Sequence, residues 1–177
     1  MNTRNLSLVT FAALAIFAGA AHASVTVVLR NVHMCCGTCV KDSDEAVATV
    51  PGAEAMSDLN SKSIAITAPD HATAQRAIDA LGNAGYYGTA TDASYAFKSA
   101  APLKETNVTS AKLTGVHLCC KKCVTAANKA LATVKGVTGN TAKEDEESFE
   151  VTGNFDPNEV IAALNKAGMT GRIEAKP

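Results

Sequence analysis

The chain contains the same cysteine-rich stretch twice, and this duplication restricts its possible folds more than any other feature. VHMCCGTCV begins at Val32 and VHLCCKKCV begins at Val116. Residues 32–52 align with residues 116–136 without a gap. Further along, AIDALGNAGYYG (77–88) is similar to VIAALNKAGMTG (160–171). A long internal repeat of this kind indicates two copies of one structural unit.

The periodicity of each copy predicts an α+β fold. Residues 24–32 are rich in β-branched side chains, which favour a strand, and apolar residues at helical spacing follow the cysteine loop up to residue 50. Residues 53–68 are typical of a hairpin that turns near Asn60, residues 71–83 predict a second helix, and residues 85–93 predict a last strand. The order β-α-β-β-α-β predicts two tandem ferredoxin-like modules.

Polar residues before the expected second helices support this interpretation. Asp70 is expected to cap the helix at residues 71–83. In the second copy, Asp156 and Pro157 are expected as the N-cap and the first helical residue of the corresponding helix.

The N-terminal residues predict export from the cytoplasm. Arg4 precedes an apolar run over residues 6–20, and AHA at 21–23 supplies the small residues of a cleavage site. The run is shorter than the roughly 20 residues that span a bilayer. We therefore expect residues 1–23 to be a signal peptide, and the mature chain to be periplasmic or secreted without membrane insertion. Residues 24–93 and 106–177 are then the two modules, joined by a linker at 94–105.

Composition narrows the possible partners. Lys and Arg number 16 against 17 Asp and Glu, so no excess of positive charge favours nucleic acid. All 6 cysteines lie in the two motifs, whereas a disulfide scaffold would scatter them along the chain. This clustering favours a metal site over a purely structural role.

The cysteine spacing suits thiolate chemistry. At the start of a helix, the helix dipole and the free N–H groups favour the thiolate over the thiol form of a C-x-x-C pair. Thiolates bind soft and borderline ions such as Cu(I), Zn(II), Cd(II) and Hg(II). A histidine precedes each motif and could add a nitrogen. The candidate metal ligands are Cys35, Cys36, Cys39 and His33 in the first copy, and Cys119, Cys120, Cys123 and His117 in the second.

Each candidate also has a plainer interpretation. The C-x-x-C cysteines could form disulfides in an oxidising compartment. The histidines could face solvent or cap a turn. Tyr86 and Tyr87 follow the second helix near the metal loop, and we expect them to pack rather than to bind.

An exposed Met-x-Cys-x-x-Cys loop between a strand and a helix resembles the heavy-metal-associated domain family, which includes copper chaperones, N-terminal modules of metal-pumping ATPases and periplasmic mercury-binding proteins. The matching residues are Met34, Cys36 and Cys39 in the first copy, and Leu118, Cys120 and Cys123 in the second. The resemblance implies that these cysteines are the main ligands.

Two departures from the family motif bear on the metal. Cys35 and Cys119 occupy its variable position and are expected to contribute less to binding than the middle cysteines. His33 and His117 replace its glycine, and the Cys-Cys-x-x-Cys loop is similar to the Cys-Cys-x-x-Glu variant of plant zinc pumps. The resemblance therefore does not favour copper alone, and zinc or copper are the expected ions.

The sequence predicts a heavy-metal-binding protein that sequesters an ion or passes it to a transporter or acceptor protein by ligand exchange. Each module is expected to bind one ion independently. No catalytic apparatus is recognisable, so we do not expect an enzyme. The alternative is a thiol–disulfide oxidoreductase that uses the C-x-x-C pairs, although the predicted strand order is not that of thioredoxin. A third possibility is a structural or partner-binding protein whose cysteines are locked as disulfides.

Overall fold

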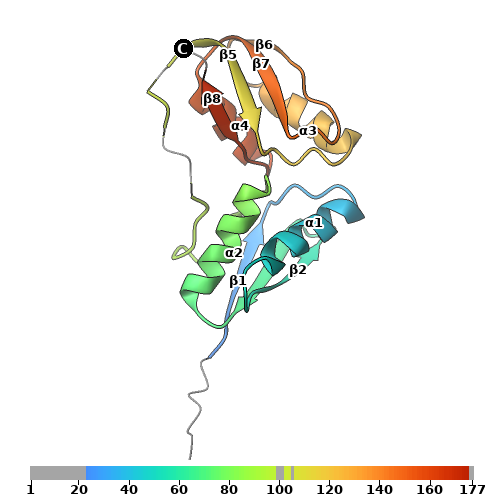
Figure 1. Ribbon diagram of the computed structural model, residues 1–177, viewed down its shortest axis with the longest axis vertical. Helices are drawn as coiled ribbons and strands as arrows, with labels where there is room; N and C mark the ends of the chain where they lie inside the picture. Colours follow the sequence, from blue (N-terminus) through green and yellow to red (C-terminus); the bar gives the residue numbers. More distant parts are fainter. Residues whose placement is uncertain (1–22, 99–101, 105, 176–177) are drawn as a thin grey trace, which may run out of the picture.

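The computed structural model describes residues 23–98, 102–104 and 106–175, and within them the chain forms two α+β modules stacked end to end (Figure 1). The expected signal peptide therefore lies outside the described residues, apart from Ala23. None of the helices in the described ranges is long and apolar enough to cross a bilayer.

Each module contains a four-stranded antiparallel sheet with two helices. The strand orders are β2-β3-β1-β4 and β6-β7-β5-β8, which confirms the two ferredoxin-like β-α-β-β-α-β units. The first module consists of β1 (Val25–Arg30), α1 (Gly37–Ala48), β2 (Glu54–Asp58), β3 (Ser63–Ala68), α2 (His71–Asn83) and β4 (Thr89–Ala90). The second consists of β5 (Val108–Thr114), α3 (Lys121–Leu131), β6 (Val137–Asn140), β7 (Ser148–Phe155), α4 (Pro157–Lys166) and β8 (Arg172–Ala175).

Local sequence signals fix the helix starts as predicted. The Asp70 carboxylate accepts a hydrogen bond from the Thr73 N–H at 2.7 Å, and the Asp156 carboxylate accepts one from the Asn158 N–H at 2.8 Å. These bonds satisfy N–H groups that lack a partner within the helix. In β3, Ile64 and Ile66 point inward and are fully buried.

The predicted linker does not begin as a free segment. Tyr95 is buried and stacks on the His71 ring with centroids 4.3 Å apart. The Gln75 side chain donates to the carbonyl of Ala96 at 2.7 Å and accepts from its N–H at 3.3 Å. These contacts attach residues 95–96 to α2, so the chain leaves the first module only after them.

The last strand of the first module is shorter than expected because its first residues serve the other module. The prediction was a strand over residues 85–93, whereas β4 covers only Thr89–Ala90. Tyr86 forms an isolated antiparallel bridge with Met169 instead. The Thr170 N–H donates to the Gly85 carbonyl at 2.9 Å, and the His33 N–H donates to the Gly168 carbonyl at 3.0 Å.

Two aligned glycines make this backbone contact possible. Gly85 and Gly168 follow α2 and α4 and have φ of +87° and +78°, where a side chain is disfavoured. A Cβ at Gly85 would come within 3.0 Å of the His117 nitrogen, and one at Gly168 within 3.0 Å of the His33 nitrogen. The two modules therefore dock backbone to backbone, with the end of α2 against the second module (Figure 1).

Candidate metal centre

Both cysteine loops end at helix N-termini that face the module junction. Cys36 is the N-cap of α1 and Cys120 is the N-cap of α3, each with an extended backbone and no capping bond from its side chain. Their sulfurs are therefore available for other contacts. Cys39 and Cys123 lie in the first turns of the same helices and are fully buried.

The residue before each cysteine pair anchors its loop. Met34 and Leu118 are buried in the hydrophobic core. The Met34 carbonyl accepts a hydrogen bond from the Lys62 ammonium, and the Leu118 carbonyl accepts one from the Asp145 N–H at 2.9 Å. The two loops are thus fixed by different groups at equivalent positions.

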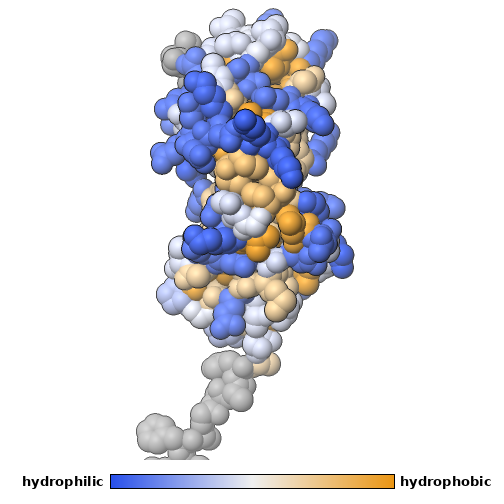
Figure 2. All heavy atoms as spheres, turned by 90° about the vertical axis from the view of Figure 1, so that its right-hand side faces the viewer, coloured by the Kyte–Doolittle hydropathy of each residue, from blue (hydrophilic) through white to orange (hydrophobic). Residues whose placement is uncertain are grey.

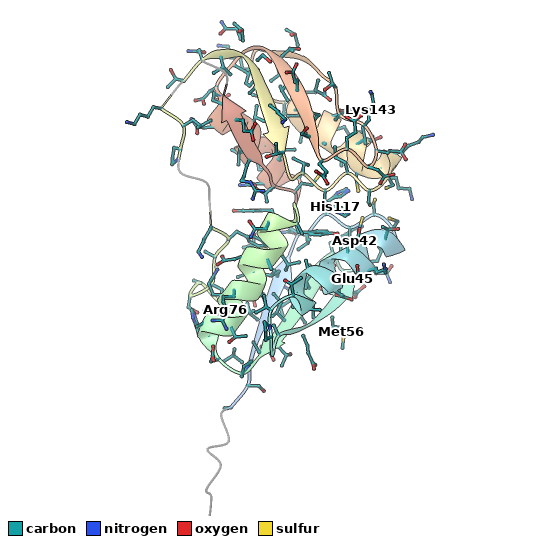
Figure 3. The ribbon with its side chains drawn as sticks, viewed as in Figure 1. Asp42, Glu45, Met56, Arg76, His117 and Lys143 are labelled. Carbon is teal, nitrogen blue, oxygen red and sulfur yellow. The ribbon has the colours of Figure 1, made fainter. Side chains whose placement is uncertain are left out.

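All six sulfurs meet in one cluster between the modules. Within each C-x-x-C pair the sulfurs are 3.7 Å (Cys36–Cys39) and 3.8 Å (Cys120–Cys123) apart. The two buried sulfurs, those of Cys39 and Cys123, are 3.8 Å apart across the junction. Figure 3 shows sulfur atoms at this junction beside His117 and Asp42. The other contacts between modules are Cys35–Cys120 at 3.3 Å, Cys35–Cys123 at 3.4 Å, Cys39–Cys119 at 3.5 Å and Cys36–Cys119 at 4.0 Å.

These separations suit a shared ion. All six cysteines are free thiols. With metal–sulfur bonds of about 2.3 Å, sulfurs around one ion lie about 3.8 Å apart in a tetrahedron and about 4.0 Å apart in a trigonal plane. The cluster distances of 3.3 to 4.0 Å lie close to both values. The donor set therefore fits a soft or borderline ion of coordination three or four.

Both histidines join the cluster. Three groups of side chains have ligand atoms within 4.8 Å of one another, and each group mixes residues of the two modules. The groups are Cys39 with His117, Cys119 and Cys123; His33 with Cys35 and Cys123; and Cys35 with Cys36 and Cys120. The expectation of two independent sites is therefore not met by the geometry, because every candidate ligand faces the junction.

His117 is held by residues of the first module. The Tyr86 hydroxyl donates to the Cys39 carbonyl at 2.8 Å and lies 3.1 Å from Nε2 of His117. Because the hydroxyl proton is already used, Nε2 of the imidazole must be the donor to the Tyr86 oxygen. Asp42 lies 3.8 Å from the same nitrogen, which also favours a proton there. In the neutral ring Nδ1 then keeps its lone pair for a metal.

His33 has no such partner. Its Nε2 is buried and makes no hydrogen bond to any described residue. Burial, the largest influence, lowers the pKa of His33 below its ordinary value of 6.5, which keeps the ring neutral as a ligand must be. At the position that aligns with Tyr86, the second module has Met169, which offers no hydroxyl.

Tyr86 is the functional residue that sequence reasoning undervalued. It packs as predicted, being fully buried, but its hydroxyl also links Cys39 to His117. The difference between Tyr86 and Met169 in otherwise similar segments was the available signal. Its meaning depends on contacts across the junction that a single module does not contain.

In the metal-free cluster the pKa values of the thiols are shifted in opposite directions. A hydrogen bond from Cys123 is the main cause that lowers the pKa of Cys39, and the same bond is the main cause that raises the pKa of Cys123. Burial raises the pKa of Cys35 to about 12, with a further contribution from Cys120. One buried thiolate is thus stabilised by neighbouring thiols, and a bound cation would displace their protons.

Cys120 is the most acidic of the half-buried cysteines with a shifted pKa. Burial opposes ionisation, but the N–H groups of Cys123 and Lys122 and the thiol of Cys35 favour the thiolate. The net effect lowers the pKa of Cys120 to about 7. This is the behaviour expected of a thiol at a helix N-terminus.

A groove of about 520 Å³ reaches the cluster from one side of the junction. Its lining includes His117 and Cys119 of the cluster and three consecutive acidic residues, 145–147. From the side of α1 and α3, Figure 2 shows an apolar band at the waist between the modules, flanked by hydrophilic surface. The outer cysteines are half-buried, so the cluster can be reached without unfolding either module.

Comparisons with known proteins find structural likenesses of low sequence identity. No protein-family model matches the chain. Similar solved structures include one from a study of crosstalk between Cu(I) and Zn(II) homeostasis, with 24% identity over 37% of this chain and 96% of the other, at a TM-score of 0.32.

Two further solved structures are similar to parts of this chain. The apo form of the HMA domain of a copper chaperone for superoxide dismutase is 21% identical over 48% of this chain and 86% of that one (TM-score 0.34). The N-terminal soluble domains of Bacillus subtilis CopA are 16% identical over 86% of this chain and 95% of theirs (TM-score 0.30).

Proposed function

We propose that this protein binds a heavy-metal ion at the junction of its two modules and sequesters it or transfers it to an acceptor. The observation that carries the proposal is the cluster of six free cysteine sulfurs, with contacts of 3.3 to 4.0 Å. When six thiols lie this close together without a disulfide, ionising several of them places negative charges side by side. The repulsion between these thiolates disfavours them unless a cation is present. A bound cation resolves that repulsion.

The donor atoms define the class of ion. Sulfur with imidazole nitrogen suits Zn(II), Cd(II), Cu(I) and Hg(II), and excludes hard ions such as Mg(II) and Ca(II), which take oxygen ligands. Zinc and copper are the proposed natural cargo. Zinc would use four donors, including a histidine, whereas Cu(I) would be satisfied by two or three sulfurs.

The burial pattern supports transfer by ligand exchange. Cys39 and Cys123 are fully buried, whereas the remaining four cysteines are half-buried. An incoming thiolate of an acceptor would first replace one of the outer sulfurs, and the buried pair would leave last. The acceptor would be a metal transporter or another metal-binding protein that meets this chain in the periplasm or outside the cell.

The test is metal binding by the reduced full chain. Zn(II) and Cu(I) are added separately under anaerobic conditions, unbound ion is removed, and X-ray absorption is measured at the metal edge. The expected spectrum is dominated by sulfur at about 2.3 Å, with nitrogen for zinc. Retention of no ion by fully reduced thiols would refute the proposal.

The alternative, a thiol–disulfide oxidoreductase, draws support from the low pKa of Cys120. It predicts that the metal-free protein exchanges disulfides with a dithiol substrate and that Cys120→Ser abolishes this activity. The metal proposal predicts instead that zinc suppresses thiol reactivity at all six positions. Thiol titration with and without zinc separates the two functions.

A further inference from the structure

We infer that the cluster holds two metal ions and that each ion takes ligands from both modules: the C-x-x-C pair of each module is completed by the first cysteine and the histidine of the other module. This rests on the proposed function and goes beyond it by assigning ligands to ions. One ion would be held by Cys120, Cys123, Cys35 and His33, and the other by Cys36, Cys39, Cys119 and His117.

The sulfur contacts around Cys35 support the first site. Its Sγ lies 3.3 Å from that of Cys120 and 3.4 Å from that of Cys123, in the other module. Its contact with Cys39, in its own module, is longer at 3.7 Å. Among the described residues Cys35 makes no sulfur contact with Cys36 that meets hydrogen-bond geometry. The shorter contacts of Cys35 thus point across the junction.

Cys119 repeats the arrangement in the opposite direction. Its Sγ lies 3.5 Å from that of Cys39 and 4.0 Å from that of Cys36, and these two sulfurs are 3.7 Å apart. Together they form a closed triangle. The corresponding triangle of Cys35, Cys120 and Cys123 has edges of 3.3, 3.4 and 3.8 Å. Each triangle can hold one ion, and no sulfur has to serve both.

A triangle within one module is less complete. Cys36 and Cys39 lie 3.7 Å apart, and so do Cys35 and Cys39, whereas the sulfurs of Cys35 and Cys36 lie within 4.8 Å of each other but make no hydrogen-bond contact in the described structure. The second module behaves alike, because Cys119 contacts Cys123 at 3.7 Å but makes no such contact with Cys120. Adjacent residues of an extended chain point to opposite sides, which explains why neighbouring cysteines face different partners.

The histidines follow the same exchange. The ring of His33 is grouped with Cys35 and with Cys123 of the other module, and its Nε2 is buried without a partner. The ring of His117 is grouped with Cys119 and Cys123 of its own module and with Cys39 of the other module, so Cys39 is its partner across the junction. In the inferred arrangement each His-x-Cys segment supplies two donors to the opposite C-x-x-C pair.

Because each ion takes ligands from both modules, metal binding would stabilise the junction between them. An ion bound in either site would connect the two modules through its ligands, in addition to the backbone bonds at Gly85 and Gly168. Release would require an outer sulfur to leave first, which opens the junction on that side.

The test uses full-length chains in which one C-x-x-C pair is removed, with Cd(II) as the probe ion. Cys36→Ser with Cys39→Ser leaves only the pair of the second module. In this background the inference predicts that adding Cys35→Ser weakens cadmium binding by more than about 100-fold, because losing one of three thiolate ligands of a soft ion costs more than the 10- to 100-fold of a supporting residue. Adding Cys119→Ser instead is predicted to change binding by less than threefold.

The reciprocal background provides the matched control. With Cys120→Ser and Cys123→Ser, Cys119→Ser must now be the damaging change and Cys35→Ser the neutral one. In each damaging case the intensity of the sulfur-to-cadmium charge-transfer absorbance should fall from the value for three bound thiolates to the value for two. The opposite pattern, with each first cysteine needed by its own module, overturns the exchange but leaves the proposed function intact. Absence of cadmium binding by the unmodified reduced chain would instead refute both.

Discussion

The two modules present the same ligands in different surroundings. Each contributes three cysteines and one histidine at equivalent positions of the same loop. Around the loops the contacts differ: Nε2 of His117 is bonded to Tyr86, whereas Nε2 of His33 is buried without a partner. Ligand atoms are constrained by the ion, while the residues that support them are free to diverge after duplication. The comparison teaches that two sites with the same set of ligand atoms can differ in their affinity for a metal ion.

The largest effects should come from the buried sulfurs, where the modules are most alike. Cys39→Ser and Cys123→Ser each remove a fully buried member of the cluster. We expect each change to abolish tight binding of one cadmium ion per chain and to do so to the same extent. Equilibrium titration with cadmium, with Ser43→Ala as a control for a buried polar change outside the cluster, measures this. Unequal losses would show that one module dominates the cluster.

The next largest effect should come from the glycines at the junction. In Gly85→Ala or Gly168→Ala the new Cβ meets backbone of the opposite module. We expect a loss of about 1–2 kcal/mol from the positive φ and a further 1–3 kcal/mol from overpacking. The measurement is the free energy of unfolding of the metal-free protein in denaturant.

Gly52→Ala is the matched control for these variants. Gly52 has a similar φ of +83°, but a Cβ there would lie an ordinary 3.5 Å from Pro69 of its own module. It should therefore show only the cost of the positive φ. If the three variants lose the same stability, and cadmium still binds with three thiolates, the glycine contacts do not hold the modules together.

The histidines should have a smaller effect that depends on the ion. We expect His33→Ala or His117→Ala to weaken Zn(II) binding at one site by about 10- to 100-fold, and Cu(I) binding by less than threefold, because sulfurs alone satisfy Cu(I). His71→Ala is the control, because His71 is exposed and is the first residue of α2, at the end of the helix away from the junction. Unchanged zinc affinity in both variants would mean that the imidazoles are not ligands.

The smallest expected effect comes from Tyr86, whose hydroxyl supports His117 and has no counterpart in the second module, where Met169 stands at the aligned position. Tyr86→Phe removes the hydroxyl that fixes the tautomer of His117, and supporting residues of this kind are worth about 10- to 100-fold in affinity. We expect a loss of about tenfold in zinc affinity at the site that contains His117 and no change at the other. An equal loss at both sites would show that Tyr86 acts on the junction as a whole.

The sequence predicts the modules well and their junction poorly. Periodicity and capping residues identify the elements, because Asp70, Asp156 and the apolar faces act over a few residues of local chain. The motif also identifies the cysteines. The role expected for Cys35, a lesser ligand of its own module, could not reveal its contacts with Cys120 and Cys123, since these depend on how two folded modules dock.

The docking itself left only indirect traces in the sequence. The Ala-Gly pair that ends α2 recurs after α4, and each glycine is adjacent to the other module's histidine. A helix-ending glycine is ordinarily explained by its positive φ alone. Only the structure shows that these two positions also lack room for a side chain.

The most direct test of the shared cluster is to identify the cysteines bound to each ion. The reduced full chain is loaded with the NMR-active isotope of cadmium, and scalar couplings from each cadmium nucleus to cysteine β-protons are recorded. We predict two cadmium signals, one coupled to Cys36, Cys39 and Cys119 and the other to Cys120, Cys123 and Cys35. Signals coupled only to cysteines of a single module would contradict a metal centre built between the modules.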